Sequence, residues 1–241
     1  MVDVNASASG GISNRGVLNE ESSSPMMTNV TAIAWDGSSV NSGVANRSSS
    51  PTMINVTARG SGGDYSYGVV NYQSSPTMTN ITAIGSGASN SYGVQNGVSS
   101  SPTMTNVTAI AYDGSYNIGI NNALSSPIMM NVTASGYGGP ANYGMRNSAS
   151  SGSCTIVVNN SRVSGSSGTS YGINNQQCGA TCTLLVNNSQ ISGSTNTIDN
   201  DGEFDVYIGA SQLSGGPVDP GVGTVKCIGV YDENYNAYSC P

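Results

Sequence analysis

The 241-residue chain contains no histidine and only six lysine and arginine residues. The missing imidazole excludes Ser-His-Asp and Cys-His nucleophilic sites and removes the commonest metal ligand. So few basic residues leave no positive patch for a phosphate backbone, and we therefore expect no nucleic-acid partner. No stretch approaches the ~18 consecutive apolar residues of a membrane-spanning helix, so we also expect no membrane insertion.

Large apolar residues are scarce as well. Leu, Ile, Val and Phe together number 43 residues, which is below the roughly 20% of a chain at which disorder is usually suspected. Disordered chains of low hydrophobicity usually also carry a high charge, but here the net charge is only −7. A polar, weakly charged chain is either a low-complexity linker or buries its few apolar groups at regular intervals. The order of the residues decides between these two.

Two short blocks alternate along the first 150 residues. The first block is SSPTMTNVTA and its near-copies, whose proline and asparagine recur every 25 or 26 residues. The second block is Gly-apolar-x-Asn, and one copy follows each copy of the first. After residue 150 the pattern diverges without stopping. The prolines of the first block are Pro25, Pro51, Pro76, Pro102 and Pro127.

No copy of the repeat contains a helical period. Apolar and polar residues alternate over short stretches, which is typical of β-strands. In the segment 77–83 we expect Met78, Ile81 and Ala83 to point inward, Asn80 to occupy a bend and Thr82 to face solvent. Three short strands in a repeat of about 25 residues predict one coil of a β-solenoid. The predicted fold is all-β, with eight or nine coils that are near-regular over 1–150 and divergent over 151–225. Residues 226–241 are expected to form a cap or a degenerate last coil.

The coil length, the MxNVxA bend strand and the GVxN strand resemble the right-handed parallel β-helix of the pectin-lyase-like superfamily. The resemblance covers nearly the whole chain, and the near-identical copies are similar to those of bacterial exported repeat proteins. It implies a right-handed helix and an extracellular or cell-surface location. Met1 is followed directly by repeat-like sequence, so we expect a fragment of a longer exported protein. Trimers of such rods occur in phage tail spikes, and both a monomer and a homotrimer are therefore open.

One asparagine recurs at the same rank, meaning the same position in successive coils. Asparagine tolerates left-handed backbone angles better than most residues, which suits a bend repeated in register. Stacked copies would bond one another's side chains, as in other stacked β structures. Several also match the Asn-x-Ser/Thr glycosylation sequon, but we expect a laddered side chain in a bend to be inaccessible and interpret it as structural. The predicted ladder is Asn29, Asn55, Asn80, Asn106, Asn131, Asn160 and Asn188.

Catalysis is one functional alternative, because the pectin-lyase-like superfamily includes polysaccharide lyases and hydrolases. Its lyases resemble one another in clustered acidic calcium ligands, and its hydrolases use grouped carboxylates. In this sequence the acidic residues are scattered, so we expect no enzyme and no cofactor. The one dense acidic segment places Asp199, Asp201 and Glu203 around a glycine. Alternating oxygens of this kind make it a candidate calcium site.

Stacked threonines suggest a second alternative. Thr77 and Thr79 flank an inward methionine, and Thr103 and Thr105 do the same one coil later. Such TxT pairs at β spacing resemble the arrays of ice-binding β-solenoids. Other coils carry Met or Ile at these ranks, so the predicted array is short. Threonine is also common on exposed strands simply because it favours β structure.

Four tyrosines share the rank that precedes the glycine of the second block. Strict alternation from the following residues points this rank inward, and we therefore favour packing in the core or at a turn. If the glycine breaks the alternation, the rings lie outside as a platform for sugar rings. These residues are Tyr67, Tyr92, Tyr143 and Tyr171.

Five cysteines lie in the C-terminal part of the chain. Cys154 and Cys182 each precede an inward valine by four residues, so we expect them to be stacked one coil apart, within the Cα range of a disulfide. Cys227 and Cys240 would staple the tail. Cys178 competes as a partner for Cys154 or Cys182, and the odd number leaves one thiol free or intermolecular. Disulfides would indicate an oxidising compartment.

The sequence therefore predicts a non-catalytic structural or binding module of an exported or surface protein. Such a module would act as a rigid spacer or as a wall that binds glycans or a cell surface. The alternatives are an ice-binding β-solenoid and a polysaccharide lyase or hydrolase.

Overall fold

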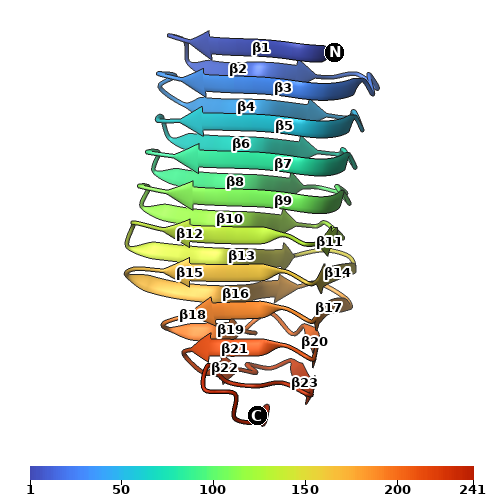
Figure 1. The fold of residues 1–241 in the computed structure, drawn as a ribbon, viewed down its shortest axis with the longest axis vertical. Coiled ribbons are helices and arrows are strands. Elements are labelled where there is room, and N and C mark those ends of the chain that lie inside the picture. Colours follow the sequence, from blue (N-terminus) through green and yellow to red (C-terminus); the bar gives the residue numbers. More distant parts are fainter.

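The chain forms a rod of stacked parallel coils. A computed structural model describes all residues 1–241 as a β-solenoid of about eight turns without any helix (Figure 1). Strands of successive coils pair in parallel and side by side along the rod, and the two termini lie at opposite ends. The all-β solenoid predicted from the repeat is confirmed. No helix long and apolar enough to cross a bilayer is present.

One wall of the rod, called sheet A, has 14 strands. In the N-terminal coils each coil contributes one long strand that is bent at an asparagine, and in the C-terminal coils this strand is split into two. The main path is β1 (Val2–Ser9), β3 (Met26–Trp35), β5 (Thr52–Ser61), β7 (Thr77–Ser86), β9 (Thr103–Tyr112), β11 (Ile128–Met130), β14 (Cys154–Asn159), β17 (Cys182–Asn187), β20 (Asp205–Gly209) and β23 (Thr224–Ile228). Beside it lie β12 (Thr133–Tyr137), β15 (Arg162–Ser166), β18 (Gln190–Gly193) and β21 (Gln212–Gly215).

The opposite wall, called sheet B, has nine strands, one from each coil. It is formed by the Gly-apolar-x-Asn blocks, so the N-terminal coils have two long strands where the sequence predicts three short ones. The strands are β2 (Ser13–Asn19), β4 (Val40–Arg47), β6 (Tyr65–Tyr72), β8 (Asn90–Gly97), β10 (Tyr116–Ala123), β13 (Ala141–Ala149), β16 (Thr169–Cys178), β19 (Asn196–Asp199) and β22 (Val218–Asp219).

The core is a narrow column between the two sheets. In sheet A the inward ranks hold methionine, valine or isoleucine, and alanine; Met78, Ile81 and Ala83 are all buried. In sheet B the glycines let the walls touch. A Cβ added to Gly68 would lie 2.3 Å from the Ile84 backbone N, which is less than any real contact. Because the sheets approach so closely, a coil needs few large apolar side chains, which accounts for the low apolar content.

Seven asparagines form a continuous ladder at the bend of sheet A. Each has a positive φ between 47° and 55°, and each after the first donates from Nδ2 to the Oδ1 of the asparagine one coil earlier. The first member, Asn29, donates to Asp3 Oδ1 at 2.8 Å. The side chains are exposed, so the expectation that this ladder is inaccessible was wrong. The bend projects the amides from the outer face, where their N–H groups are engaged with one another.

A second, buried asparagine ladder follows sheet B, at the last position of the Gly-apolar-x-Asn block. Here each amide donates to the Oδ1 of the asparagine one coil later, at 2.8 to 3.0 Å. The two ladders therefore run in opposite directions along the rod. The second N–H of Asn46 reaches the Met53 sulfur at 3.7 Å. The buried ladder comprises Asn19, Asn46, Asn71, Asn96, Asn122, Asn147, Asn175 and Asn200.

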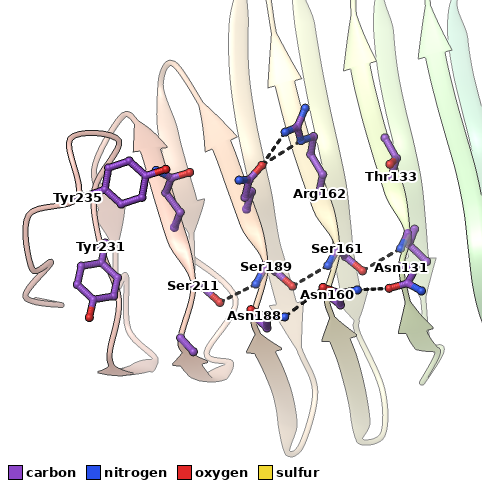
Figure 2. A pocket seen from close by; sticks show the side chains of 14 residues that line it. Asn131, Thr133, Asn160, Ser161, Arg162, Asn188, Ser189, Ser211, Tyr231 and Tyr235 are labelled. Atoms are coloured by element: carbon purple, nitrogen blue, oxygen red, sulfur yellow. Dashed lines mark hydrogen bonds between the residues drawn. The ribbon is translucent and has the colours of Figure 1, made fainter.

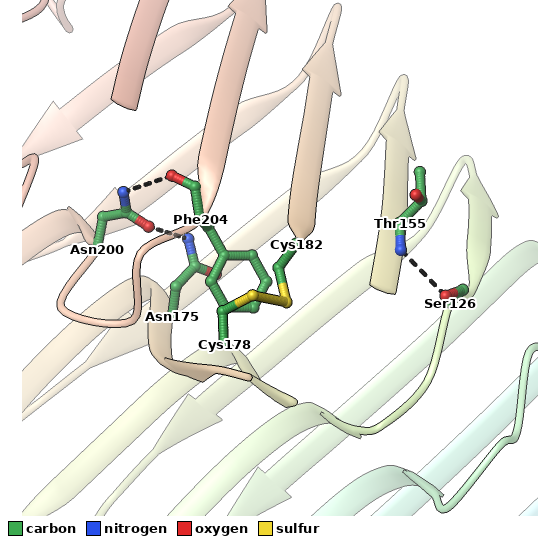
Figure 3. The surroundings of a disulfide bond; sticks show 7 residues. All are labelled: Ser126, Thr155, Asn175, Cys178, Cys182, Asn200 and Phe204. Atoms are coloured by element: carbon green, nitrogen blue, oxygen red, sulfur yellow. Dashed lines mark hydrogen bonds between the residues drawn. A yellow bond between two sulfur atoms is a disulfide. The ribbon is translucent and has the colours of Figure 1, made fainter. Parts of the chain in front are cut away.

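Two disulfides close the C-terminal part. Figure 3 shows Cys178 bonded to Cys182, with their Cα atoms 5.9 Å apart, and Cys227 is bonded to Cys240. Cys154 and Cys182 are register partners on adjacent strands, as their spacing predicts, and Cys182 is bonded to Cys178, the competing partner that the sequence left open. The side chains of Cys154 and Cys182 are parallel on strands about 4.8 Å apart, whereas disulfide Cβ atoms prefer about 3.8 Å. Cys154 is left as a free, buried thiol.

Candidate functional site

A groove of about 560 Å³ runs over the bend of sheet A in the C-terminal half of the rod (Figure 2). Its floor is the end of the exposed asparagine ladder, one wall is the rank that follows the bend, and the C-terminal segment closes one end. Its lining is Asn131, Val132, Thr133, Asn160, Ser161, Arg162, Asn188, Ser189, Gln190, Ala210, Ser211, Gln212, Tyr231 and Tyr235.

The ladder is interrupted inside this groove. Asn188 donates to Asn160 Oδ1 at 3.1 Å, but the next coil has Ala210 at the bend, also with a positive φ. No side chain donates to the Asn188 Oδ1, so this carbonyl oxygen is an open acceptor in the groove.

A row of serines holds the floor rigid. The Oγ of Ser161 accepts from the Val132 N–H at 3.0 Å, and the Oγ of Ser189 accepts from the Ser161 N–H at 3.0 Å. Ser211 repeats the arrangement in the next coil. Each hydroxyl also donates to the carbonyl two residues earlier. Each hydroxyl has its donor and one acceptor position engaged by the protein, and the three serines are buried, so they support the floor of the groove.

The wall of the groove changes chemistry along the rod. In the N-terminal coils this rank is threonine, but here it continues as Arg162, Gln190, Gln212 and then Tyr231, in register. Arg162 donates from Nε and Nη2 to Gln190 Oε1 at 3.1 and 2.7 Å. Gln212 donates to the Asp232 carbonyl at 3.3 Å. The wall therefore offers an oriented guanidinium and amides at the coil spacing.

Two tyrosines stand at the closed end of the groove. Tyr231 and Tyr235 are 46% and 80% exposed, and Figure 2 shows both rings on the C-terminal segment beside the ladder. The turn between them is fixed by Asp232, whose carboxylate accepts from the N–H groups of Asn234 and Asn236. Hydrogen bonds from Asn236 come first among the causes that hold the pKa of Asp232 below its usual value. An exposed ring beside fixed amides suits a ligand with one apolar face and a polar edge.

The threonines predicted as a ligand face lie on the outer side of sheet A. Thr77 pairs with Thr103 and Thr79 with Thr105, so they form two stacked pairs. A longer threonine array lies on the other side of the bend, one residue per coil over five consecutive coils and paired in register. Sequence reasoning missed it as an array, although each member is the threonine two residues after the bend asparagine. It comprises Thr31, Thr57, Thr82, Thr108 and Thr133.

None of the four tyrosines of sheet B belongs to the hydrophobic core cluster, although Tyr92 is only 8% exposed, so the inward direction that strict alternation predicts for this rank is wrong. In β6, Ser66, Val69 and Asn71 are buried, and the strand register skips Gly68. The glycine thus breaks the alternation and leaves Tyr67 on the outer face, outside the hydrophobic core cluster. The same holds for Tyr92, Tyr143 and Tyr171.

These outer tyrosines stack on one another along the rod. The ring centroids of Tyr67 and Tyr92 are 5.1 Å apart, and those of Tyr143 and Tyr171 are 5.2 Å apart, with nearly parallel planes. Burial raises the pKa of Tyr67 and of Tyr92 above the ordinary value. Each stack covers its own inner ring faces, so only the ring faces at its ends are open to a ligand.

Three carboxylates gather at the C-terminal end of sheet B. Oxygens of Asp199, Asp201 and Asp219 lie within 4.8 Å of one another. Glu203, the third residue of the predicted calcium candidate, does not belong to this group, and Asp219 lies there because β22 puts it in register with Asp199. Burial, and then the charge of Asp201, raise the pKa of Asp199. Asn174 donates to Asp199 Oδ2 at 2.6 Å.

The groove, the threonine array and the tyrosine stacks are therefore surface features built on one repeating backbone. Comparison with protein-family models, with curated proteins and with solved structures found no match to this chain.

Proposed function

We propose that this chain is a non-catalytic, glycan-binding β-solenoid that acts as a rigid rod. The observation that carries the proposal is the groove where exposed Tyr231 and Tyr235 stand beside an exposed amide ladder. A sugar ring presents apolar C–H groups on its face and hydroxyls on its edge. The tyrosine rings suit the face, and the amides suit the edge.

The open end of the ladder gives the groove a defined polarity. The Asn188 Oδ1 can accept a hydrogen bond from a sugar hydroxyl, while Arg162 and Gln190, which are bonded to each other, can donate hydrogen bonds to hydroxyl oxygens. The side chains of the groove follow one another at the coil spacing of about 4.8 Å along the rod, so successive residues of an oligosaccharide each lie beside one coil. A linear glycan lying along the rod fits this arrangement better than a compact ligand does.

Two further properties belong to the same proposal. The disulfides Cys178–Cys182 and Cys227–Cys240 support an extracellular or cell-surface location, because such bonds persist in oxidising compartments. The parallel coils of about 25 residues support a β-helix of the pectin-lyase-like kind. A lyase assay with and without calcium tests the enzymatic alternative, and turnover in either condition would overturn the non-catalytic assignment.

The test is binding to a printed array of neutral linear oligosaccharides, followed by calorimetric titration with the best-bound member. We expect Tyr235→Ala and Arg162→Ala each to weaken binding by about tenfold or more, the size of a lost aromatic or charged contact. Tyr116→Ala, which removes an exposed ring from sheet B, is the matched control and should change nothing. No bound glycan, or equal losses in all three variants, would refute the proposal.

A specific observation also favours a second candidate, ice binding. Five threonines in register on β3, β5, β7, β9 and β12 form a regular row of hydroxyl and methyl groups at the strand spacing. Such a row can order water at a fixed repeat. Thermal hysteresis of the unaltered protein tests this candidate, and its absence at millimolar concentration rejects it. If hysteresis is found, Thr82→Tyr should abolish it, while Thr155→Tyr, outside the row, should not.

A further inference from the structure

A separate pocket of about 320 Å³ lies on the outer face of sheet B near the N-terminal end of the rod. It spans β2, β4 and β6, on a different wall from the groove. Its lining contains two arginines and two tyrosines around a serine and two valines: Arg15, Val40, Ser42, Arg47, Tyr67, Val70 and Tyr72.

The pocket exists because β4 carries a short side chain at the rank that is tyrosine in the next two coils. Ser42 is in register with Arg15 on one side and Tyr67 on the other. A short side chain between two long ones leaves a space about one coil deep. Along the rod, the space is therefore as deep as one layer of the stack that Tyr67 and Tyr92 form.

Two of the six basic residues of the chain meet at this pocket. Burial lowers the pKa of Arg15, and the nearby charge of Arg47 lowers it further. Glu20 offsets this only in part, since it makes an exposed contact with Arg47 at 3.7 Å. Two like charges facing one space are complementary to an anion, and a guanidinium pairs best with a planar or tetrahedral oxyanion.

The floor of the pocket has an unused hydrogen-bonding group. Ser42 is 1% exposed, and its Oγ has no hydrogen-bond partner. A buried hydroxyl without a partner is unfavourable, and a ligand oxygen at this level would supply one. The roof is Tyr67, which stacks on Tyr92 on one side and lines the pocket. A ligand ring at the level of Ser42 would extend the stack by one layer.

We propose that this pocket binds a sugar ring that carries an acidic group. The carboxylate or sulfate lies between Arg15 and Arg47, the ring packs against Tyr67, and a hydroxyl or acid oxygen bonds Ser42. The site is distinct from the groove and does not depend on the groove binding glycans. It makes the rod able to hold an anionic saccharide despite its net negative charge.

The experiment is calorimetric titration of the whole chain with methyl β-D-glucuronide. Methyl β-D-glucoside, benzoate and inorganic sulfate serve as separate probes. We expect the glucuronide to bind, and the glucoside to bind at least about tenfold more weakly, since it lacks the charge-assisted hydrogen bonds. Benzoate binding more tightly than the glucuronide would overturn the assignment to a sugar. Sulfate binding as tightly as the glucuronide would show that the ring contributes nothing.

Ser42→Tyr is the decisive variant, because tyrosine occupies this rank in the next two coils and should fold without strain. It should fill the pocket and abolish glucuronide binding while the melting temperature is kept. Arg15→Gln should weaken binding about tenfold or more through loss of one charged partner. Arg146→Gln, on the same sheet but bonded to Gln176, is the control.

Unchanged affinity in Ser42→Tyr would refute the proposal. Tyr235→Ala must leave glucuronide binding intact, so failure of this site and failure of the groove are distinguished.

Discussion

Replacing Asn71 with alanine removes one rung of the buried ladder. The native amide donates to Asn96 Oδ1 at 2.9 Å and accepts from Asn46 Nδ2 at 2.8 Å. It also reaches the Met78 sulfur at 3.9 Å. Alanine leaves one N–H of Asn46 and the Oδ1 of Asn96 without partners, in a place that water does not reach.

The loss in the free energy of unfolding comes more from leaving buried polar groups unpaired than from losing the hydrogen bonds themselves. An unsatisfied buried polar group costs about 1–3 kcal/mol. Two such groups give an expected loss of about 2–6 kcal/mol in the free energy of unfolding. Repacking reduces this little, because the walls already touch through glycine and leave the neighbouring amides no room to turn toward a new partner.

The exposed ladder provides the comparison. Asn80 makes two hydrogen bonds of 3.0 Å, but water replaces them when the side chain is removed. Asn80→Gly should therefore cost only about 1 kcal/mol, near the lower limit for two net hydrogen bonds. Asn80→Ala should cost about 1 kcal/mol more, because φ is 55° there and a Cβ disfavours that region.

Urea denaturation followed by circular dichroism measures these differences, with Thr82→Ala as the surface control. Because solenoids lose stability coil by coil, amide hydrogen exchange across β6 and β8 should accompany it. Protection in Asn71→Ala should fall first in the coils next to the lost rung. A smaller loss for Asn71→Ala than for Asn80→Gly would refute the reasoning, since burial would then not be what makes the inner ladder valuable.

Three other predictions concern the core, the acidic cluster and the free thiol. Gly68→Ala should lower the melting temperature strongly or prevent folding, since its Cβ would meet backbone at 2.3 Å, whereas Gly97→Ala, with its nearest neighbour at 3.6 Å, should be nearly neutral. The raised pKa of Asp199 means that the folded state binds the carboxyl proton more tightly than the unfolded state does. The protonated group therefore stabilises the fold at low pH, and that stabilisation is lost as pH rises through the folded pKa. Asp199→Asn should therefore raise the melting temperature at pH 7 without calcium. Burial raises the pKa of Cys154 to about 11, so Ellman's reagent should titrate no thiol in the native protein and one in urea.

Each of these has a clear contrary result. A stable Gly68→Ala rod would mean that the two walls are not in backbone contact. A lower melting temperature for Asp199→Asn at pH 7 would mean that the folded protein stabilises the carboxylate, either through the hydrogen bond from Asn174 or through an ion, and stabilisation of the unaltered protein by added calcium would identify the ion. Rapid reaction of a native thiol would place Cys154 at the surface.

The repeat predicts most of the fold because, in a parallel solenoid, residues one repeat apart in the sequence are register partners in adjacent coils. The spacing of 25 or 26 residues places Asn55 beside Asn29 and Asn80 beside Asn55 without further information. Spacing does not show which way a side chain points once a glycine intervenes. At Gly68 the alternation breaks, so Tyr67 lies outside although counting back from Val69 places it inside.

The candidate sites were harder to predict because each depends on a departure from the repeat. The groove ends on Tyr231 and Tyr235, which belong to a tail with no copy elsewhere in the chain. The pocket on sheet B depends on a serine, Ser42, at a rank where the next two coils have tyrosine. A small residue in place of a large one does not form a recognisable motif. The signal that was available is the substitution itself, a small residue at a rank that is otherwise large.

The opposite directions of the two asparagine ladders have an electrostatic consequence for the length of the rod. Side-chain amide dipoles aligned head to tail would sum along the axis, as peptide dipoles do in a helix, and would build charge of opposite sign at the two ends. Here the outer column points its N–H groups toward the N-terminus and the inner column toward the C-terminus. The two fields largely cancel within each coil. Duplicating or deleting a coil adds or removes one member of each column, so the two columns stay opposed whatever the number of coils.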